Sequence, residues 1–172
     1  MHLILIGYMA AGKTTLGRKL AQYLNRPFID LDQWIEAQAG LSISQIFDQY
    51  GEELFRNLER KAIQNLNQLP TAHVVATGGG LPCQGDNINK LKDSGMVIYL
   101  RPSFEVLLAR LQAMRSQRPL LKDVSAETLP DFIEKMLHQR EPYYRQAHHI
   151  LELDTLELLP MIKQLEKLQL LP

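Results

Sequence analysis

Residues 7–14 read Gly-Tyr-Met-Ala-Ala-Gly-Lys-Thr, which fits the pattern G-x-x-x-x-G-K-[ST]. The apolar run 3–6 comes directly before this stretch, and leucines recur every four residues after it, at positions 16, 20 and 24. A strand, a glycine-rich turn and an amphipathic helix are therefore expected in this order, which is the setting of a phosphate-binding loop. In such a loop, backbone N–H groups face phosphate oxygens, Lys13 reaches the terminal phosphates and the Thr14 hydroxyl ligates Mg²⁺. The alternative is a chance glycine-rich turn with a surface lysine, which the flanking strand and helix disfavour.

The rest of the chain repeats this alternation of short apolar runs and longer helical patterns. Further strands are predicted at 27–30, 74–77, 96–100 and 149–153, and a long helix marked by apolar residues from Phe55 to Leu69 ends before Pro70. A closing helix is predicted over 160–168. Continuous apolar strands that alternate with helices predict an α/β fold with a parallel sheet covered on both faces. Ligands of such folds bind beyond the carboxyl ends of the strands, so functional residues are expected just after each strand.

Composition restricts the class of protein. The 172 residues correspond to one domain, over 1–172, and 45% of them are hydrophobic, which suffices for a core. Nineteen Lys and Arg balance nineteen Asp and Glu, which argues against a protein held to nucleic acid by its overall charge but not against a local basic site. The single cysteine, Cys83, excludes an intrachain disulfide. Because no apolar run reaches about 18 residues and no signal-peptide pattern opens the chain, we expect a cytoplasmic protein that does not contact a membrane.

Two carboxylates follow the second predicted strand, at Asp30 and Asp32. At this edge of a parallel sheet, one could hold a metal ion through water while the other takes a substrate hydroxyl. The alternative is a helix cap, since aspartate is a common N-cap and a helix is predicted to begin near Gln33.

Two arginines stand out on predicted helices. Arg56 has Glu52 four residues before it and Glu59 three residues after it, so that an ordinary solvated arginine with helical ion-pair partners is one interpretation. Arg140 continues an apolar stripe that includes Phe132 and Leu137, so its side chain is expected to face inward. An inward arginine needs an anion or a hydrogen-bonded pocket, unless it extends to solvent at the helix end. Together the two arginines suit bidentate capture of a carboxylate.

Two loops complete the set of candidates. Gly78-Gly79-Gly80 follows a predicted strand and allows a ligand to approach the backbone closely, although a flexible turn is the simpler interpretation. The basic and apolar segment 114–123 lies between two predicted helices. It predicts a mobile lid that brings Arg118 over the phosphates, or else an exposed connector.

Taken together, these residues resemble the shikimate kinase family over nearly the whole chain. The resemblance rests on the loop 7–14, Asp30-x-Asp32, Phe55-Arg56-x-x-Glu59, Gly78-Gly79-Gly80, Arg118-Pro119-Leu120-Leu121 and Arg140-x-x-Tyr143-Tyr144. It implies the three-layer P-loop kinase fold, in which helices flank a five-stranded parallel sheet and a lid covers the site. It also implies transfer of the γ-phosphoryl group of ATP, with Mg²⁺, to the 3-hydroxyl of shikimate in aromatic amino acid biosynthesis.

The same resemblance implies a role for each matching residue. The catalytic residues would be Lys13, Asp32 and Arg118. The ATP site would comprise Gly7, Ala10, Ala11, Gly12, Lys13, Thr14, Thr15, Arg110 and Arg118. The shikimate site would comprise Asp32, Arg56, Gly78, Gly79, Gly80 and Arg140, with Glu59 orienting Arg56. The Mg²⁺ site would comprise Thr14 and Asp30. Ala10 departs from the family, since many members have a third glycine there, and a positive φ at alanine is strained.

Two other functions stay open at this stage. A kinase of another small hydroxy acid, such as gluconate, could use the same fold. A catalytically silent nucleotide-binding domain would need the loss of a catalytic group, but Lys13, Thr14, Asp32 and Arg118 are all present. The expected partner is shikimate alone, with no nucleic acid, and the expected state is a monomer.

Overall fold

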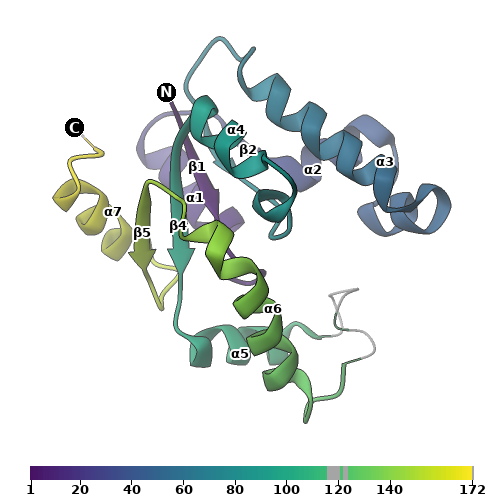
Figure 1. The fold of residues 1–172 in the computed structure, drawn as a ribbon. Coiled ribbons are helices and arrows are strands. Elements are labelled where there is room, and N and C mark those ends of the chain that lie inside the picture. The colour runs from purple at the N-terminus through teal and green to yellow at the C-terminus, as the bar shows by residue number, and fades with distance from the viewer. Residues whose placement is uncertain (116–120, 122–123, 172) are drawn as a thin grey trace.

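The structure, a computed structural model, describes residues 1–115, 121 and 124–171. At its centre is a parallel sheet with the strand order β2-β3-β1-β4-β5 (Figure 1). The strands are β1 His2–Ile6, β2 Phe28–Asp30, β3 Val74–Ala76, β4 Gly95–Arg101 and β5 His149–Glu152. Since β1 is the middle strand, the loop after it leaves the sheet at the centre of the carboxyl edge, where α/β folds bind ligands. The predicted α/β class and five parallel strands are confirmed, and each strand agrees with its prediction to within one residue at either end.

Helices cover both faces of the sheet (Figure 1). Helix α1 packs on β1, β2 and β3 and contacts α7, whereas α4 contacts β4, α3 and the 3₁₀ helix η1, which also contacts α6. Their bounds are α1 Lys13–Tyr23, α2 Leu31–Ala39, α3 Ile43–Leu66, η1 Leu81–Cys83, α4 Asn87–Ser94, α5 Phe104–Ala113, α6 Leu129–Tyr144 and α7 Leu158–Lys167. Every residue of β1 is buried, as expected for a central strand covered on two sides.

The long helix α3 differs most from its prediction. It begins at Ile43, where Ser42 forms a capping box, and it ends at Leu66, before the predicted stop at Pro70. Gly51 interrupts it with φ 78°, a left-handed conformation that divides the helix into two segments. The first segment is mostly exposed, so apolar spacing could not predict it.

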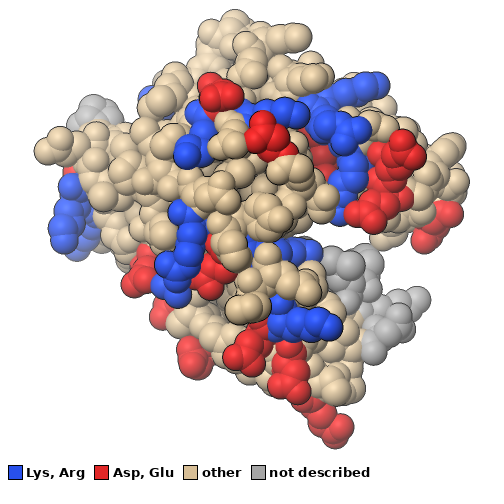
Figure 2. Space-filling view, in the orientation of Figure 1, with Lys and Arg blue, Asp and Glu red and all other residues tan. Residues whose placement is uncertain are grey.

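Charges of both signs are mixed on the surface. On the face seen in Figure 2, lysines and arginines lie beside acidic residues, without a continuous basic area. The outline in this view is indented at its right-hand edge, between the part with α2 and α3 and the part with α5 and α6 (Figures 1 and 2). Within the described ranges 1–115, 121 and 124–171, no helix has the length and apolar character needed to cross a membrane.

Candidate functional site

The loop between β1 and α1 has the backbone conformation of a phosphate-binding loop. Gly7 and Gly12 have φ of 142° and 99°, and Gly12 is the N-cap of α1. A Cβ atom at Gly7 would lie 2.6 Å from the carbonyl oxygen of Leu100, and one at Gly12 would collide with Leu156. Both positions therefore favour glycine for their conformation, and Gly7 also requires it for the space beside a backbone oxygen.

The side chain of Lys13 is buried against its own loop. Its Nζ donates hydrogen bonds to the carbonyl oxygens of Gly7 and Tyr8, each at 2.8 Å. The ammonium group thus lies at the N-terminus of α1, where the helix dipole also favours an anion. A bound phosphate could replace these carbonyl oxygens as its partner.

Ala10 has φ 60°, the strained conformation expected at this position. Its carbonyl oxygen accepts a 3.0 Å hydrogen bond from Arg110 Nη1, and Arg110 Nη2 donates to the carbonyl oxygen of Asp154, also at 3.0 Å. Arg110 therefore joins the phosphate loop to the loop after β5. Burial lowers the pKa of this arginine, and the charge of Asp154 opposes that effect.

Thr14 and Asp30 bring two oxygen ligands together. Thr14 Oγ1 donates to Asp30 Oδ2 at 2.6 Å, while Asp30 Oδ1 accepts the backbone N–H of Asp32 at 3.1 Å. The N-cap of α2 is thus Asp30, and the helix begins at Leu31 rather than near Gln33 as predicted. A hydroxyl and a carboxylate oxygen are ligands that suit Mg²⁺, which keeps several waters besides. The two residues fit a magnesium site beside the phosphate loop.

Asp32 lies against the glycine-rich turn. A Cβ atom at Gly78 would come within 2.5 Å of Asp32 Oδ1, so a larger residue would displace this carboxylate. The acidic side chain, at the start of α2, therefore reaches the turn that follows β3.

Arg56 is fixed by two carboxylates. Its Nη1 donates to Glu59 Oε2 at 2.7 Å and its Nη2 to Glu52 Oε1 at 2.8 Å. Glu59 is 1% exposed, and burial raises its pKa, although Arg56 acts in the opposite direction. Burial opposes the charge of Arg56, but hydrogen bonds and charges from Glu59 and Glu52 outweigh it and raise the arginine's pKa. The predicted helical partners are confirmed, and they hold a guanidinium group that is only partly exposed.

The two arginines meet at the glycine-rich turn. A Cβ atom at Gly79 would lie 3.5 Å from Arg140 Nη1 and 3.4 Å from the backbone nitrogen of Met9, and one at Gly80 would lie 3.8 Å from Arg56 Nη1. The turn is therefore close to both guanidinium groups and to the phosphate loop. Arg140 also lies over the ring of Tyr8, with its Cζ 5.6 Å from the ring centroid. This inward position favours the pocket interpretation of Arg140 over extension to solvent.

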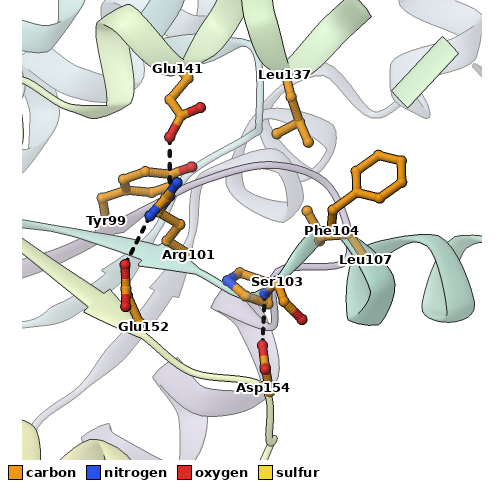
Figure 3. A pocket seen from close by; sticks show the side chains of 10 residues that line it. Tyr99, Arg101, Ser103, Phe104, Leu107, Leu137, Glu141, Glu152 and Asp154 are labelled. Carbon is orange, nitrogen blue, oxygen red and sulfur yellow. Dashed lines mark hydrogen bonds and ion pairs between the residues drawn. The ribbon is translucent and has the colours of Figure 1, made fainter. Parts of the chain in front are cut away.

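A separate cavity of about 460 Å³ lies near the carboxyl ends of β4 and β5 (Figure 3). Arg101 bridges Glu141 and Glu152 there, and Ser103 donates its backbone N–H to Asp154. The side chain of Phe104 comes from α5 and lies near Leu137 of α6 in the same view. Arg101, Glu141 and Glu152 of this cavity are paired with one another, whereas Asp154 accepts a backbone N–H. The predicted site residues lie outside its lining.

Comparisons with known proteins agree with this geometry. Residues 9–165 match the sequence model of the family described as shikimate kinase. The chain belongs to the shikimate kinase family. A curated shikimate kinase of Phocaeicola vulgatus is 43% identical over 156 residues, which cover 91% of this chain and 89% of that protein.

Solved structures of shikimate kinases have the same fold. One from Bacteroides thetaiotaomicron superposes with a TM-score of 0.91 at 38% identity and covers 99% of both chains. Another, from Acinetobacter baumannii in complex with shikimate, has a TM-score of 0.83 at 35% identity, covering 98% of this chain and 93% of that one. The predicted family, fold and class of enzyme, an ATP-dependent kinase, are thereby confirmed.

Most of the residues matched to the shikimate kinase motifs come together at one edge of the sheet. The phosphate loop follows β1, Asp30 ends β2 and contacts Thr14, and the turn 78–80 follows β3. Arg56 and Arg140 reach that turn from α3 and α6. Thr15 is exposed in the first turn of α1, and Ala11 is buried behind the loop. Arg118 and most of the predicted lid over 114–123 lie outside the described residues.

Sequence reasoning missed contacts made by aromatic side chains. Tyr144, which the sequence identifies only as part of the motif that begins at Arg140, donates its hydroxyl to the carbonyl oxygen of Gly79 at 2.6 Å. The ring of Tyr8, within the phosphate loop, faces Arg140. The motif that ends in Tyr143-Tyr144 marked the segment, but no local pattern connects it with a glycine 65 residues earlier.

Proposed function

We propose that this protein transfers the γ-phosphoryl group of ATP to the 3-hydroxyl of shikimate and so forms shikimate 3-phosphate. The observation that carries the proposal is the convergence of Arg56 and Arg140 on the turn 78–80, directly beside the phosphate loop. Two guanidinium groups can hold a carboxylate while a hydroxyl on the same small molecule faces the phosphates. The complex of the Acinetobacter baumannii enzyme with shikimate supports this choice of acceptor.

On the nucleotide side, we assign the phosphates to the backbone of Gly7, Ala10, Ala11 and Gly12 and to the start of α1, including Thr15. Lys13, which lies between the loop carbonyl oxygens, would turn to the β- and γ-phosphates and neutralise the charge that develops during transfer. We assign Arg110, which joins the phosphate loop to the loop after β5, to the nucleotide as well. We assign Arg118 to the same phosphates from the lid.

On the acceptor side, Asp32 is the residue that would orient the reacting hydroxyl and accept its proton. It lies against Gly78, within the same turn that the arginines reach. A carboxylate there can bind two hydroxyls of a ring and hold the 3-hydroxyl in line with the γ-phosphorus. Glu59, through its 2.7 Å ion pair, would fix Arg56 for the acceptor's carboxylate.

Thr14 and Asp30 are the residues that would hold Mg²⁺, Thr14 directly and Asp30 through water. When bound, the ion neutralises phosphate oxygens of ATP and favours in-line transfer. Their 2.6 Å contact sets the two oxygens side by side for this purpose. Closure of the predicted lid would exclude water, which could otherwise accept the phosphoryl group.

The test is release of ADP from ATP and Mg²⁺ with shikimate, with gluconate or without an acceptor. We expect a large increase with shikimate alone, and ³¹P NMR of the product should show a single phosphate ester at the 3-position. An increase with gluconate alone would favour the other hydroxy acid kinase, and no increase with either would favour the silent nucleotide-binding domain. We further propose that residues 1–172 act as one domain, as a monomer in the cytoplasm.

A further inference from the structure

The hydroxyl of Tyr144 contacts the glycine-rich turn close to Arg140, and the proposed reaction assigns it no role. Tyr144 is the last residue of α6, is fully buried, and lies four residues after Arg140 on the same helix. Residues four apart share a helix face, so both side chains point to the glycine-rich turn. The hydroxyl donates to the carbonyl oxygen of Gly79 at 2.6 Å, and a Cβ atom at Gly79 would lie 3.5 Å from Arg140 Nη1.

This hydrogen bond fixes a peptide plane. In a trans peptide, the carbonyl oxygen and the following N–H point in opposite directions. Because Tyr144 holds the oxygen of Gly79, the N–H of Gly80 must point away from the tyrosine. Gly79 and Gly80 lack side chains that would lock this plane by packing, and glycine has more backbone freedom than any other residue. The backbone hydrogen bond from the Leu81 N–H to the Gly78 carbonyl oxygen, at 3.3 Å, closes the turn but leaves the orientation of the Gly79–Gly80 peptide to another contact.

We propose that Tyr144 is a positioning residue for the acid substrate: its hydroxyl sets the orientation of the Gly79–Gly80 peptide and, with it, the spacing between the turn and Arg140. The inference rests on the proposed function, since it concerns the site for the acceptor's carboxylate and not the nucleotide. Tyr144 itself lies behind the turn. Its effect on the substrate passes through Gly79 and Arg140.

The environment of Tyr144 keeps this donor in place. Burial raises the pKa of its hydroxyl well above the ordinary value of tyrosine, although Arg140 acts in the opposite direction, so the proton is retained across the working pH range. Its ring packs on the ring of Tyr99, with centroids 5.1 Å apart. Phenylalanine at position 144 would keep this packing and would remove the hydrogen bond to Gly79, together with the interactions of the hydroxyl with Arg140 and Cys83.

The test compares Tyr144→Phe with the wild type and two controls in steady-state kinetics. Tyr144→Phe is expected to raise KM for shikimate about tenfold, with KM for ATP and the ATPase rate without acceptor unchanged. Tyr99→Phe removes the hydroxyl of the ring that packs against Tyr144, and Tyr143→Phe removes the neighbouring one. Both controls should keep KM for shikimate within about twofold of the wild type.

A purely structural role would lower the melting temperature of Tyr144→Phe without a selective change in KM for shikimate. That result overturns the inference, as does a variant that fails to fold while Tyr99→Phe folds, or an equal rise in both KM values. If the wild type itself shows no shikimate-dependent release of ADP, the proposed function fails instead. The wild-type assay therefore separates the two failures.

Discussion

The phosphate loop and the proposed acid site (Asp32, Arg56, Arg140 and the turn 78–80) lie beside each other at the sheet edge, but they are built in different ways. The loop is one continuous segment, 7–14, whose glycine conformations and carbonyl oxygens hold its own lysine. The acid site draws Asp32, Arg56 and Arg140 from three helices onto the turn 78–80. Each of its arginines contacts a further side chain that is almost fully buried, Glu59 for Arg56 and Tyr8 for Arg140.

This difference predicts which substitutions impair each region. The loop holds Lys13 through its own carbonyl oxygens, so a change of this lysine alters the chemistry without removing a contact of Arg56 or Arg140 described above. An assembled site depends on supports, such as Glu59 for Arg56 and the Tyr8 ring for Arg140. We therefore expect changes in the loop to lower kcat, and changes in the acid site or its supports to raise KM for shikimate.

Lys13→Met should have the largest effect. Without the ammonium group, the negative charge that develops on the transferring phosphoryl group is less well neutralised, and kcat should fall by about 10³-fold. Initial rates at saturating ATP and shikimate measure this change. Lys19→Met, which removes an exposed lysine of α1 whose Nζ contacts Leu156, is the control and should stay near the wild-type rate. A similar fall in both variants would contradict the assignment of Lys13.

Arg140→Ala should come next. Loss of a guanidinium group from the carboxylate should raise KM for shikimate about 100-fold, since truncation of one partner in a charged contact costs a few kcal/mol. KM for ATP should change little. The matched control is Arg145→Ala, an exposed arginine one turn later that pairs with Glu141. An unchanged KM for shikimate in Arg140→Ala would exclude the proposed acid site.

Glu59→Gln should have a smaller effect, because it acts through Arg56. An amide keeps the size of the side chain but weakens the charged hydrogen bond, so KM for shikimate should rise about five- to tenfold. Glu52→Gln changes the other partner, whose side chain is 63% exposed, and should have less effect because solvent screens it. Equal effects would mean that the buried carboxylate does not hold Arg56 more firmly than the exposed one.

Ala10→Gly tests the strain in the phosphate loop. A glycine tolerates φ 60°, so the variant should gain about 1 kcal/mol in free energy of unfolding. Ala109→Gly, at an exposed helical position in α5, should lose about the same amount. Chemical denaturation measures both. Destabilisation by Ala10→Gly would show that the alanine is not strained.

His2 lies at the opposite end of the sheet. Its substitution should change the free energy of unfolding and leave the affinities for nucleotide and for shikimate unchanged. It accepts the backbone N–H of His73 on Nδ1, and its Nε2 contacts the carbonyl oxygen of Leu66, each at 3.0 Å. Burial lowers its pKa, so the unfolded chain binds a proton more readily. The stabilisation by His2 is complete above pH about 6.5 and is lost as the pH falls below that value.

Denaturation midpoints between pH 8 and pH 5 should therefore fall in the wild type and fall less in His2→Asn. KM for shikimate at pH about 7.5 should be the same in both proteins. A steeper fall in the variant would show that His2 is not the group responsible.

The two regions also differ in how far the sequence could predict them. The phosphate loop was predictable because its chemistry is local: glycines, lysine and threonine at fixed spacing after an apolar strand. Asp30 and Asp32 were predictable as a pair, but the sequence did not show that Asp30, which caps α2, also contacts Thr14, since this contact depends on the packing of α1 on β2. The spacing of Arg140 predicted an inward side chain, as observed.

The contacts of the acid site could not be predicted in the same way. The hydrogen bond from Tyr144 to Gly79 depends on the packing of α6 near the turn after β3, which no local pattern encodes. The first segment of α3 was also missed, since exposed residues carry little periodic signal. Long-range packing, rather than propensity, decides these features.

The most direct test of two separate regions is a crossed binding experiment by titration calorimetry. Shikimate and ADP with Mg²⁺ are each titrated into Arg140→Ala and Lys13→Met. We predict that Arg140→Ala loses affinity for shikimate and keeps its affinity for ADP. Lys13→Met should lose affinity for ADP and keep its affinity for shikimate. Shikimate binding to Arg140→Ala with wild-type affinity, or equal losses of both ligands in both variants, would contradict the account.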